Sequence, residues 1–318
     1  HGPHLHPAEM HRPQPRDDEH GRQLLQQLGV SPGHQGGKQR QEAARLRRPS
    51  VYLEETWPEA RLTPQQELIV STWEDILARR IPEKHLVVGG GHGLGKDWLV
   101  ARLALGYFEA HPRALCVTTA PSERQVLDLI WRELRRACPE RLRPGLMPRA
   151  PYLEGNDKTL QGFSTDEAER MQGRHAEYLL GIIDEGPGVP ESSWQALEMC
   201  ATGEHNHLFA IGNPTDPYDA FSQRAKDPHW KFLSLSCLDH PNVTADKELF
   251  PGMVTRAWVR EQLDRHSFSL PPGSAPLEQE EGWLEFDGLW WRITNFIMGR
   301  ILGRIPRAAE DQLILPEL

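Results

Sequence analysis

The stretch that decides the fold is residues 85–99, which read HLVVGGGHGLGKDWL. A short apolar run enters a glycine-rich turn, and a lysine stands where an apolar helical pattern begins. Gly90, Gly95 and Lys96 match the spacing G-x-x-x-x-G-K, in which backbone N–H groups surround phosphate oxygens and the lysine reaches the outer phosphates. The stretch predicts a phosphate-binding loop between a strand and a helix, with a purely structural turn as the alternative.

One position departs from this pattern. Asp97 follows the lysine, where a Ser or Thr that holds Mg²⁺ is usual. A carboxylate is a hard oxygen ligand, able to bind Mg²⁺ directly or through water. Asp97 is therefore a candidate metal ligand.

Composition narrows the class of protein. The chain has 318 residues, of which 38% are hydrophobic, and a formal net charge of −9. This length allows about two domains with a sizeable core. No apolar run approaches the roughly 18 residues of a membrane span, and the first residues lack the features of a signal peptide, so a cytosolic protein without membrane contact is expected. The charge argues against a surface coated with basic residues but leaves local DNA contacts open.

The cysteines are too far apart for a metal or disulfide framework. Cys116, Cys138, Cys200 and Cys237 form no C-x-x-C pair. Reduced thiols in or near the core are expected.

The first 50 residues are rich in His, Pro, Gln and Arg and have few aliphatic residues. Such a segment buries too little apolar surface to order itself, so residues 1–50 are predicted to be a disordered tail. Its histidines lack the regular spacing of metal ligands. The basic end of the tail leaves a contact with DNA or a partner open.

A helix is predicted from Pro64, because Thr63-Pro64 is a typical helix start and apolar residues then recur at helical spacing. Gln65 and Gln66 lie in its first turn, ahead of the phosphate loop. Their amides either read the edge of an adenine or are ordinary exposed side chains.

Beyond the loop, the apolar pattern predicts alternating helices and strands, typical of an α/β fold with a mainly parallel sheet. We expect one helix to continue from Ser122 through Ala137, with a basic face that either meets phosphate or is simply solvated. Residues 139–158 are expected to be a surface excursion. The expected strands are 114–119, 160–165, 178–183, 207–212 and 232–237, and the expected helices are 98–110, 166–171, 191–202, 254–266 and 290–304, with a loop at 238–242.

A second motif follows the strand at 178–183, where the sequence reads YLLGIIDE. Ligands gather at the carboxyl ends of parallel strands, and two acids stand at this end. In ATP hydrolysis such a pair has distinct uses: Asp184 would hold Mg²⁺, and Glu185 would orient and deprotonate the attacking water. Simple loop residues are the alternative.

Asn213 comes directly after the strand at 207–212. A polar residue at this strand end would lie beside the terminal phosphate and sense its loss. Asn-Pro is also a common way to start a turn.

The ordered set of motifs resembles the ATPase domain of tailed-bacteriophage terminase large subunits, which are DNA-packaging motors. The resemblance extends from Thr63 to the end of the chain. It is carried by residues 91–97 (GHGLGKD), 118–121 (TTAP) with Arg124-Gln125, 172–175 (QGRH) and 183–190 (IDEGPGVP), and it is extended by 212–215, 236–243 and 303–306.

The resemblance implies a P-loop NTPase of the additional-strand, catalytic-glutamate type, with a mainly parallel central sheet flanked by helices and a small helical C-terminal subdomain. It gives Glu185 the role of catalytic base, Asp184 and Asp97 that of metal ligands, and Asn213 that of coupling residue. Arg124 and Arg174 are candidates for an arginine finger, acting in cis or from a neighbouring subunit. The implied ATP-binding residues are Gln66, Gly90, Gly91, His92, Gly93, Leu94, Gly95, Lys96 and Asp97, with Lys96 on the phosphates.

The resemblance also suggests a domain plan. Residues 51–245 would form the ATPase domain, and residues 246–318 a C-terminal subdomain or linker. In the family a nuclease domain would follow where this chain ends, so DNA cleavage by this chain is not expected. A fragment, a separately encoded motor half and a prophage remnant all remain open.

The function implied is Mg²⁺-dependent ATP hydrolysis that drives double-stranded DNA into a procapsid. The implied cofactors are ATP and Mg²⁺. The implied partners are double-stranded DNA, the portal protein and procapsid, the small terminase subunit and further copies of the chain in a ring, in the cytoplasm of a bacterial host. Another P-loop nucleic-acid translocase of helicase type, or an inactive nucleotide-binding remnant, are the alternatives.

Overall fold

A seven-stranded sheet runs through the part of the chain that the computed structural model describes, residues 47–165, 174–276 and 282–308. The strand order is β3-β4-β2-β5-β6-β1-β7, and only β3 is antiparallel to its neighbour. The strands are β1 (His85–Gly90), β2 (Leu115–Ala120), β3 (Tyr152–Gly155), β4 (Lys158–Ser164), β5 (Tyr178–Ile183), β6 (His205–Gly212) and β7 (Trp230–Leu235). The predicted α/β class is confirmed.

The position of β6 decides the type of fold. This strand lies between β1, which enters the glycine-rich loop, and β5, which delivers Asp184 and Glu185. It is the additional strand expected from the sequence. The parallel strands place the residues after β1, β5 and β6 at one edge of the sheet.

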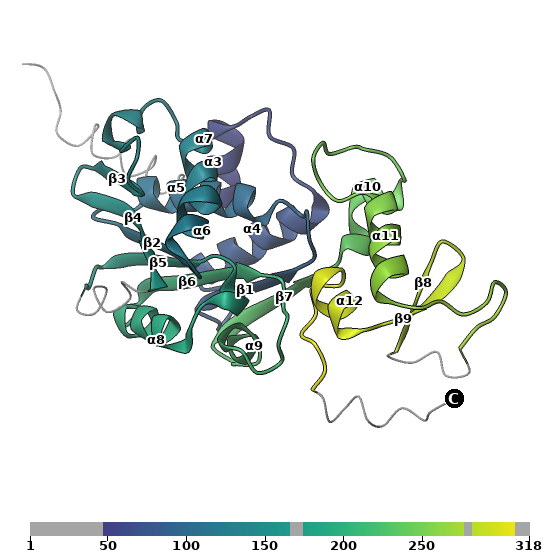
Figure 1. Ribbon diagram of the computed structural model, residues 1–318. Helices are drawn as coiled ribbons and strands as arrows, with labels where there is room; N and C mark the ends of the chain where they lie inside the picture. Colours follow the sequence, from purple (N-terminus) through teal and green to yellow (C-terminus); the bar gives the residue numbers. More distant parts are fainter. Residues whose placement is uncertain (1–46, 166–173, 277–281, 309–318) are drawn as a thin grey trace, which may run out of the picture. The chain divides into compact units, whose positions relative to one another are not determined.

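Helices cover both faces of this sheet, as Figure 1 shows. Side chains along β1 alternate between two buried clusters: Leu86 and Val88 face one, and Val87 faces the other. The first cluster includes residues of α3 (Pro49–Thr56), α4 (Pro64–Leu77), α5 (Lys96–Ala110), α6 (Glu123–Asp128) and α7 (Ile130–Ala137). The second includes residues of α8 (Glu191–Cys200) and α9 (Ala220–Arg224).

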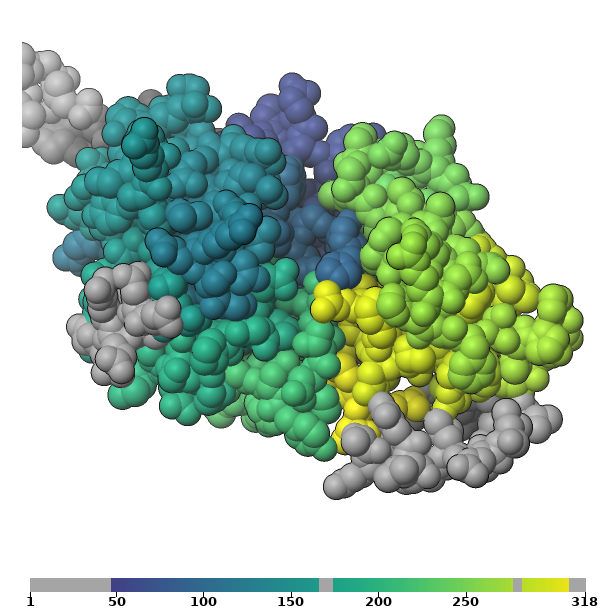
Figure 2. Space-filling view, viewed as in Figure 1, coloured from purple at the N-terminus to yellow at the C-terminus, as the bar shows by residue number. Residues whose placement is uncertain are grey.

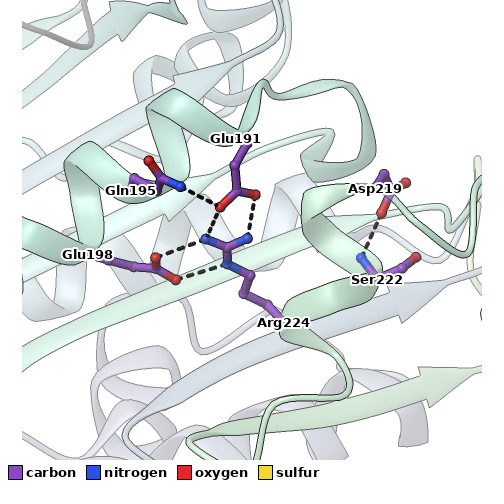
Figure 3. A network of polar contacts seen from close by, with 6 residues as sticks. All are labelled: Glu191, Gln195, Glu198, Asp219, Ser222 and Arg224. Atoms are coloured by element: carbon purple, nitrogen blue, oxygen red, sulfur yellow. Dashed lines mark hydrogen bonds and ion pairs between the residues drawn. The ribbon is translucent and has the colours of Figure 1, made fainter.

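On the second face, Arg224 joins α8 to α9. Its guanidinium forms ion pairs with Glu191 and with Glu198, the latter at 2.9 Å, as Figure 3 shows. The Arg224 side chain is 11% exposed and also lies over the ring of Trp194. The network fixes α9 against α8.

The remaining elements follow β7. They are the 3₁₀ turn η4 (Cys237–Asp239), α10 (Pro241–Thr244), α11 (Arg256–His266), α12 (Asn295–Arg300) and a separate two-stranded sheet of β8 (Trp283–Phe286) and β9 (Leu289–Arg292). Figure 1 shows α11, α12 and the β8–β9 hairpin together at one end of the sheet, beyond β7. The domain boundary expected near residue 245 stays a prediction.

Several local predictions were wrong. Residues 290–304 do not form one helix, because Asp287 and Gly288 both have positive φ and close a β8–β9 hairpin before α12. The helix predicted from Ser122 is broken at Leu129, whose φ is −105° and ψ −90°. The predicted excursion at 139–158 contains a 3₁₀ turn η1 (Arg143–Gly145) and β3, and the loop predicted at 238–242 contains η4 and α10.

Other predictions on the element level are confirmed, including the start of α4 at Pro64 and the burial of all four cysteines as reduced thiols. The helix predicted at 166–171 and nearly all of the tail predicted at 1–50 lie outside the described residues. No helix among the described residues is long and apolar enough to cross a membrane.

Candidate nucleotide-binding site

The glycine-rich loop turns sharply between β1 and α5. Gly93 and Gly95 have φ values of 69° and 68°, a region that L side chains rarely adopt. Gly95 is the residue before the first turn of α5, so the N–H groups of that turn face the loop. Such a helix start is a ready anion site.

A pocket of about 520 Å³ lies over this loop. Figure 2 shows it as a hollow between the teal surface that includes α7 and the green surface that precedes α11. The predicted residues that line it come from the loop and from the ends of β5 and β6. The full lining is His92, Gly93, Leu94, Gly95, Lys96, Asp97, Trp98, Arg132, Glu133, Arg136, Asp184, Glu185, Gly212, Asn213, Pro251, Gly252 and Met253.

Lys96 folds back over the loop. Its Nζ donates to the carbonyl oxygens of Gly90 at 3.3 Å and Gly91 at 3.0 Å. Burial lowers the pKa of Lys96, and the nearby carboxylates of Asp97, Glu185 and Asp184 oppose that shift. The ammonium is thus held where an anion on the loop would meet it.

Asp184 is buried at the end of β5, with 1% of its surface exposed. Its Oδ1 accepts from the N–H of Glu185 at 2.9 Å, whereas its Oδ2 is buried with no hydrogen-bond partner among the described residues. Burial, together with the charge of Asp97, raises the pKa of Asp184 well above its usual value. On the adjacent strand end, Thr119 Oγ1 is a second buried oxygen without such a partner.

Asp97, in the first turn of α5, lines the same pocket. Burial raises the pKa of its carboxyl, and the charge of Lys96 opposes the rise. Two carboxylates and an unpartnered oxygen in a site of hard oxygen donors fit a divalent cation such as Mg²⁺, which would relieve the repulsion between Asp97 and Asp184.

Glu185 follows Asp184 in a left-handed backbone conformation, with φ 48° and ψ 44°. This conformation is uncommon for a residue with a side chain and is often found at functional sites. Burial raises the pKa of Glu185, while the positive charges of Lys96 and Arg300 lower it. The carboxylate lines the same pocket as Lys96 and Asp184.

Asn213, directly after β6, is 5% exposed and contacts the loop itself. Its Nδ2 donates to the carbonyl oxygen of Gly90, which also accepts from Lys96. The predicted coupling residue is therefore in direct contact with the phosphate loop.

Gln66 lies behind the loop rather than in the pocket. Its Oε1 accepts from the N–H of Thr63 at 3.0 Å, and its Nε2 donates to the carbonyl oxygens of Leu94 and Gly95 at 3.4 and 3.3 Å. Both ends of the amide are thus engaged within the protein, so Gln66 braces the loop against the start of α4. Its contact with an adenine stays a prediction.

The two arginines proposed as fingers are outside the pocket. Arg124 is exposed and pairs with Asp128 of its own helix at 3.1 Å, and Arg174 is exposed as well. Neither is among the described residues that line the pocket. Their action on a neighbouring subunit stays a prediction.

Of the other charged residues near the site, Arg132 and Arg136 belong to the basic helix face that was expected to meet either phosphate or solvent, whereas Arg300 was missed. Arg132 and Arg136 of α7 line the pocket on either side of Glu133, with which both pair. Their spacing of four places both arginines on one face of α7, the basic face noted in the sequence. Arg300, whose charge acts on Glu185, is far away in the sequence and gave no local signal.

The proteins to which this chain is similar are terminases of bacteriophages. A comparison with protein-family models finds no match. Over 180 residues the chain is 26% identical to a probable terminase large subunit of Enterobacteria phage P7, a match that covers 52% of this chain and 35% of that protein. The chain thus spans about a third of the length of this curated relative.

Among solved structures, a mutant of the large terminase ATPase domain of Thermus phage P74-26 superposes with a TM-score of 0.51 and 17% identity, over 68% of this chain and 92% of that one. The large terminase of another thermophilic bacteriophage, in complex with ADP, gives a TM-score of 0.47 and 15% identity, over 64% and 50% of the two chains. The part of the chain that the structure describes therefore has the fold of a bacteriophage large-terminase ATPase domain, as the resemblance in its sequence predicts.

Proposed function

We propose that this chain is the ATP-hydrolysing motor part of a phage terminase large subunit and uses ATP to translocate double-stranded DNA into a procapsid. The observation that carries the proposal is the pocket that Lys96, Asp184, Glu185 and Asn213 share above the glycine-rich loop. Fold alone does not give function, and these residues supply the chemistry that ATP hydrolysis needs.

Each residue has a defined part in the reaction. Backbone N–H groups of the loop and the Lys96 ammonium hold the phosphates and offset their charge. Glu185 orients a water molecule toward the terminal phosphorus and accepts its proton, so that ATP and water give ADP and inorganic phosphate. Asn213 touches the loop carbonyl of Gly90 and so connects loss of the terminal phosphate to β6.

Asp97 and Asp184 are the residues that would hold Mg²⁺, on the evidence of the unpartnered Asp184 Oδ2 and the paired carboxylates. When bound, the cation would neutralise phosphate charge and polarise the terminal phosphoryl group. Mg²⁺ dependence of the activity is part of the proposal.

The proposed partners follow from the motor role. They are double-stranded DNA, the portal protein of the procapsid, the small terminase subunit and neighbouring copies in a ring, and the proposed setting is the cytoplasm of a bacterial host. The phage P7 relative supports this proposal, because that protein is named a probable terminase large subunit.

The proposal is tested with Glu185→Gln, which keeps the shape of the side chain but removes the base. Phosphate release in the presence of Mg²⁺ should fall at least about 100-fold, while binding of ATPγS changes little. Glu204→Gln is the matched control, because Glu204 is exposed and pairs with Arg79 at the far end of β6. Undiminished phosphate release by the Glu185 variant would refute the assigned role.

A second measurement separates packaging from other motor functions. The full chain is mixed with procapsids bearing a portal, and protection of DNA from nuclease is followed with ATP. Protection that depends on procapsids supports the terminase function. Strand separation on a tailed duplex without procapsids would instead indicate a helicase-type translocase.

A further inference from the structure

The end of α12 packs directly on the phosphate loop. The N–H of His92 donates to the carbonyl oxygen of Arg300 at 3.0 Å, and the N–H of Cys237, just past β7, donates to that of Ile301 at 2.7 Å. Ser234 Oγ on β7 lies 3.2 Å from the carbonyl oxygens of both Leu302 and Gly303. Residues 300–303 are thus hydrogen-bonded to the loop and to the strand beside it.

This contact leaves no space between the two backbones. A Cβ on Gly91 would lie 2.7 Å from the carbonyl oxygen of Ile301, and a Cβ on Gly89 would lie 2.6 Å from that of Gly303. Gly303 itself has a φ of 64°, and a Cβ on it would lie 2.5 Å from the carbonyl oxygen of Gly89. Because glycines permit this approach on both sides, the position of Arg300 relative to the loop is fixed by backbone contacts.

The Arg300 side chain turns toward the loop. Its Nη1 lies 2.8 Å from Nε2 of His92, whose ring also meets Trp258 edge to face, with centroids 6.0 Å apart. Burial, followed by the charges of Arg300 and Lys96, lowers the pKa of His92 to about 4. The imidazole is therefore neutral near pH 7, and its Nε2 accepts a hydrogen bond from the guanidinium.

Arg300 lacks the partner that most arginines near the pocket have. Arg132 and Arg136, which line the pocket, both pair with Glu133 of α7. Among the described residues Arg300 forms no ion pair with a carboxylate, although it is half-buried and its charge reaches Glu185. A neutral imidazole is a weaker partner for a guanidinium than a phosphate, which accepts charge-assisted hydrogen bonds.

We propose that Arg300 contacts the terminal phosphate of the bound nucleotide, so that the C-terminal part of the chain completes the site in cis. The inference rests on the proposed function. The guanidinium is held beside the pocket by His92, a loop residue that lines it, and its charge acts on Glu185, which lines the pocket as well. The arrangement would let the C-terminal elements distinguish a triphosphate from a diphosphate, because only the triphosphate carries the terminal phosphate that Arg300 would contact.

The test compares binding of ATPγS and ADP, with Mg²⁺, to the full chain and its variants. Arg300→Met keeps an unbranched apolar stem but removes the guanidinium and its charge. We expect the affinity for ATPγS to fall roughly 10-fold to 100-fold while that for ADP is unchanged, and kcat to fall roughly 100-fold. Arg300→Lys, which keeps a charge, should restore part of the preference for ATPγS.

Arg304→Ala is the matched control, because Arg304 is exposed and lies on the same segment; it should bind both nucleotides as the wild type does. Thermal unfolding of each variant identifies any loss of folding. If Arg300→Met does not fold, the two nucleotide affinities of Arg300→Lys decide the test. An Arg300→Met chain that keeps the wild-type ratio of the two affinities, or loses both affinities equally, would overturn the role of Arg300 but not the proposed function. A wild-type chain that binds neither nucleotide would overturn the proposed function with it.

Discussion

At the scale of single residues, the role proposed for Asp97 in binding Mg²⁺ is open to a direct test. Its carboxyl shares a buried space with Asp184, and the repulsion between them contributes to the raised pKa of Asp184. If both bind Mg²⁺, Asp97→Ser should keep activity, because a hydroxyl is the usual ligand at this position. Asp97→Ala should raise the Mg²⁺ concentration for half-maximal activity about 10-fold, an estimate from the loss of groups that support a metal site.

The measurement is a Mg²⁺ titration of phosphate release, with Asp128→Ala as control because Asp128 is exposed on α6. An alanine variant at position 97 with the wild-type Mg²⁺ dependence would remove Asp97 from the metal site.

Sequence predicts individual site residues best when their partners are local. Lys96 follows the loop that it contacts, and Asp184 and Glu185 follow one apolar strand, so their positions could be read from adjacent residues. Arg300 meets His92 across 208 positions, and Gln66 meets Gly95 across 29. Such contacts depend on the packing of distant elements, which no local pattern records.

At the scale of elements, the Arg224 network is predicted to stabilise the second face of the sheet. The guanidinium is held by two carboxylates and covered by Trp194. Arg224→Ala would leave Glu191 and Glu198 facing each other, although both are partly exposed. The free energy of unfolding should fall by about 2 kcal/mol, measured by urea denaturation.

Lys226→Ala is the control for this prediction, because Lys226 is exposed and its ammonium donates to the backbone carbonyl oxygen of Pro217. Equal stability of the Arg224 and Lys226 variants would show that the network adds little.

The elements themselves differ in how well sequence predicts them. Strands β1, β5 and β6 are buried on both faces and read as continuous apolar runs. In the β8–β9 hairpin, apolar residues of both strands and of α12 occur close together and imitate a single helix. Asp287-Gly288 was the decisive turn signal.

The whole molecule carries buried neutral histidines, which make its stability depend on pH. His85, His111 and His207 are packed around β1, α5 and β6, and burial lowers their pKa values to about 3, 4 and 4. An unfolded chain takes up these protons near pH 6.5, whereas the folded chain takes them up only near pH 4 or below. The unfolded state therefore binds more protons between these values, and stability falls as the pH falls through this window.

His207→Gln isolates one contribution. His207 is 5% exposed, and its Nδ1 lies 2.9 Å from the carbonyl oxygen of Lys84, a contact that a glutamine amide is able to replace. With a folded pKa of about 4, this residue should account for about 2 kcal/mol of the stability lost between pH 7 and pH 5. Urea denaturation at both pH values should show a loss of stability that is smaller by this amount in the variant than in the wild type.

His229→Gln, at an exposed site paired with Asp227, should lose stability as the wild type does. An unchanged loss in the His207 variant would mean that this buried ring does not set the acid sensitivity of the fold.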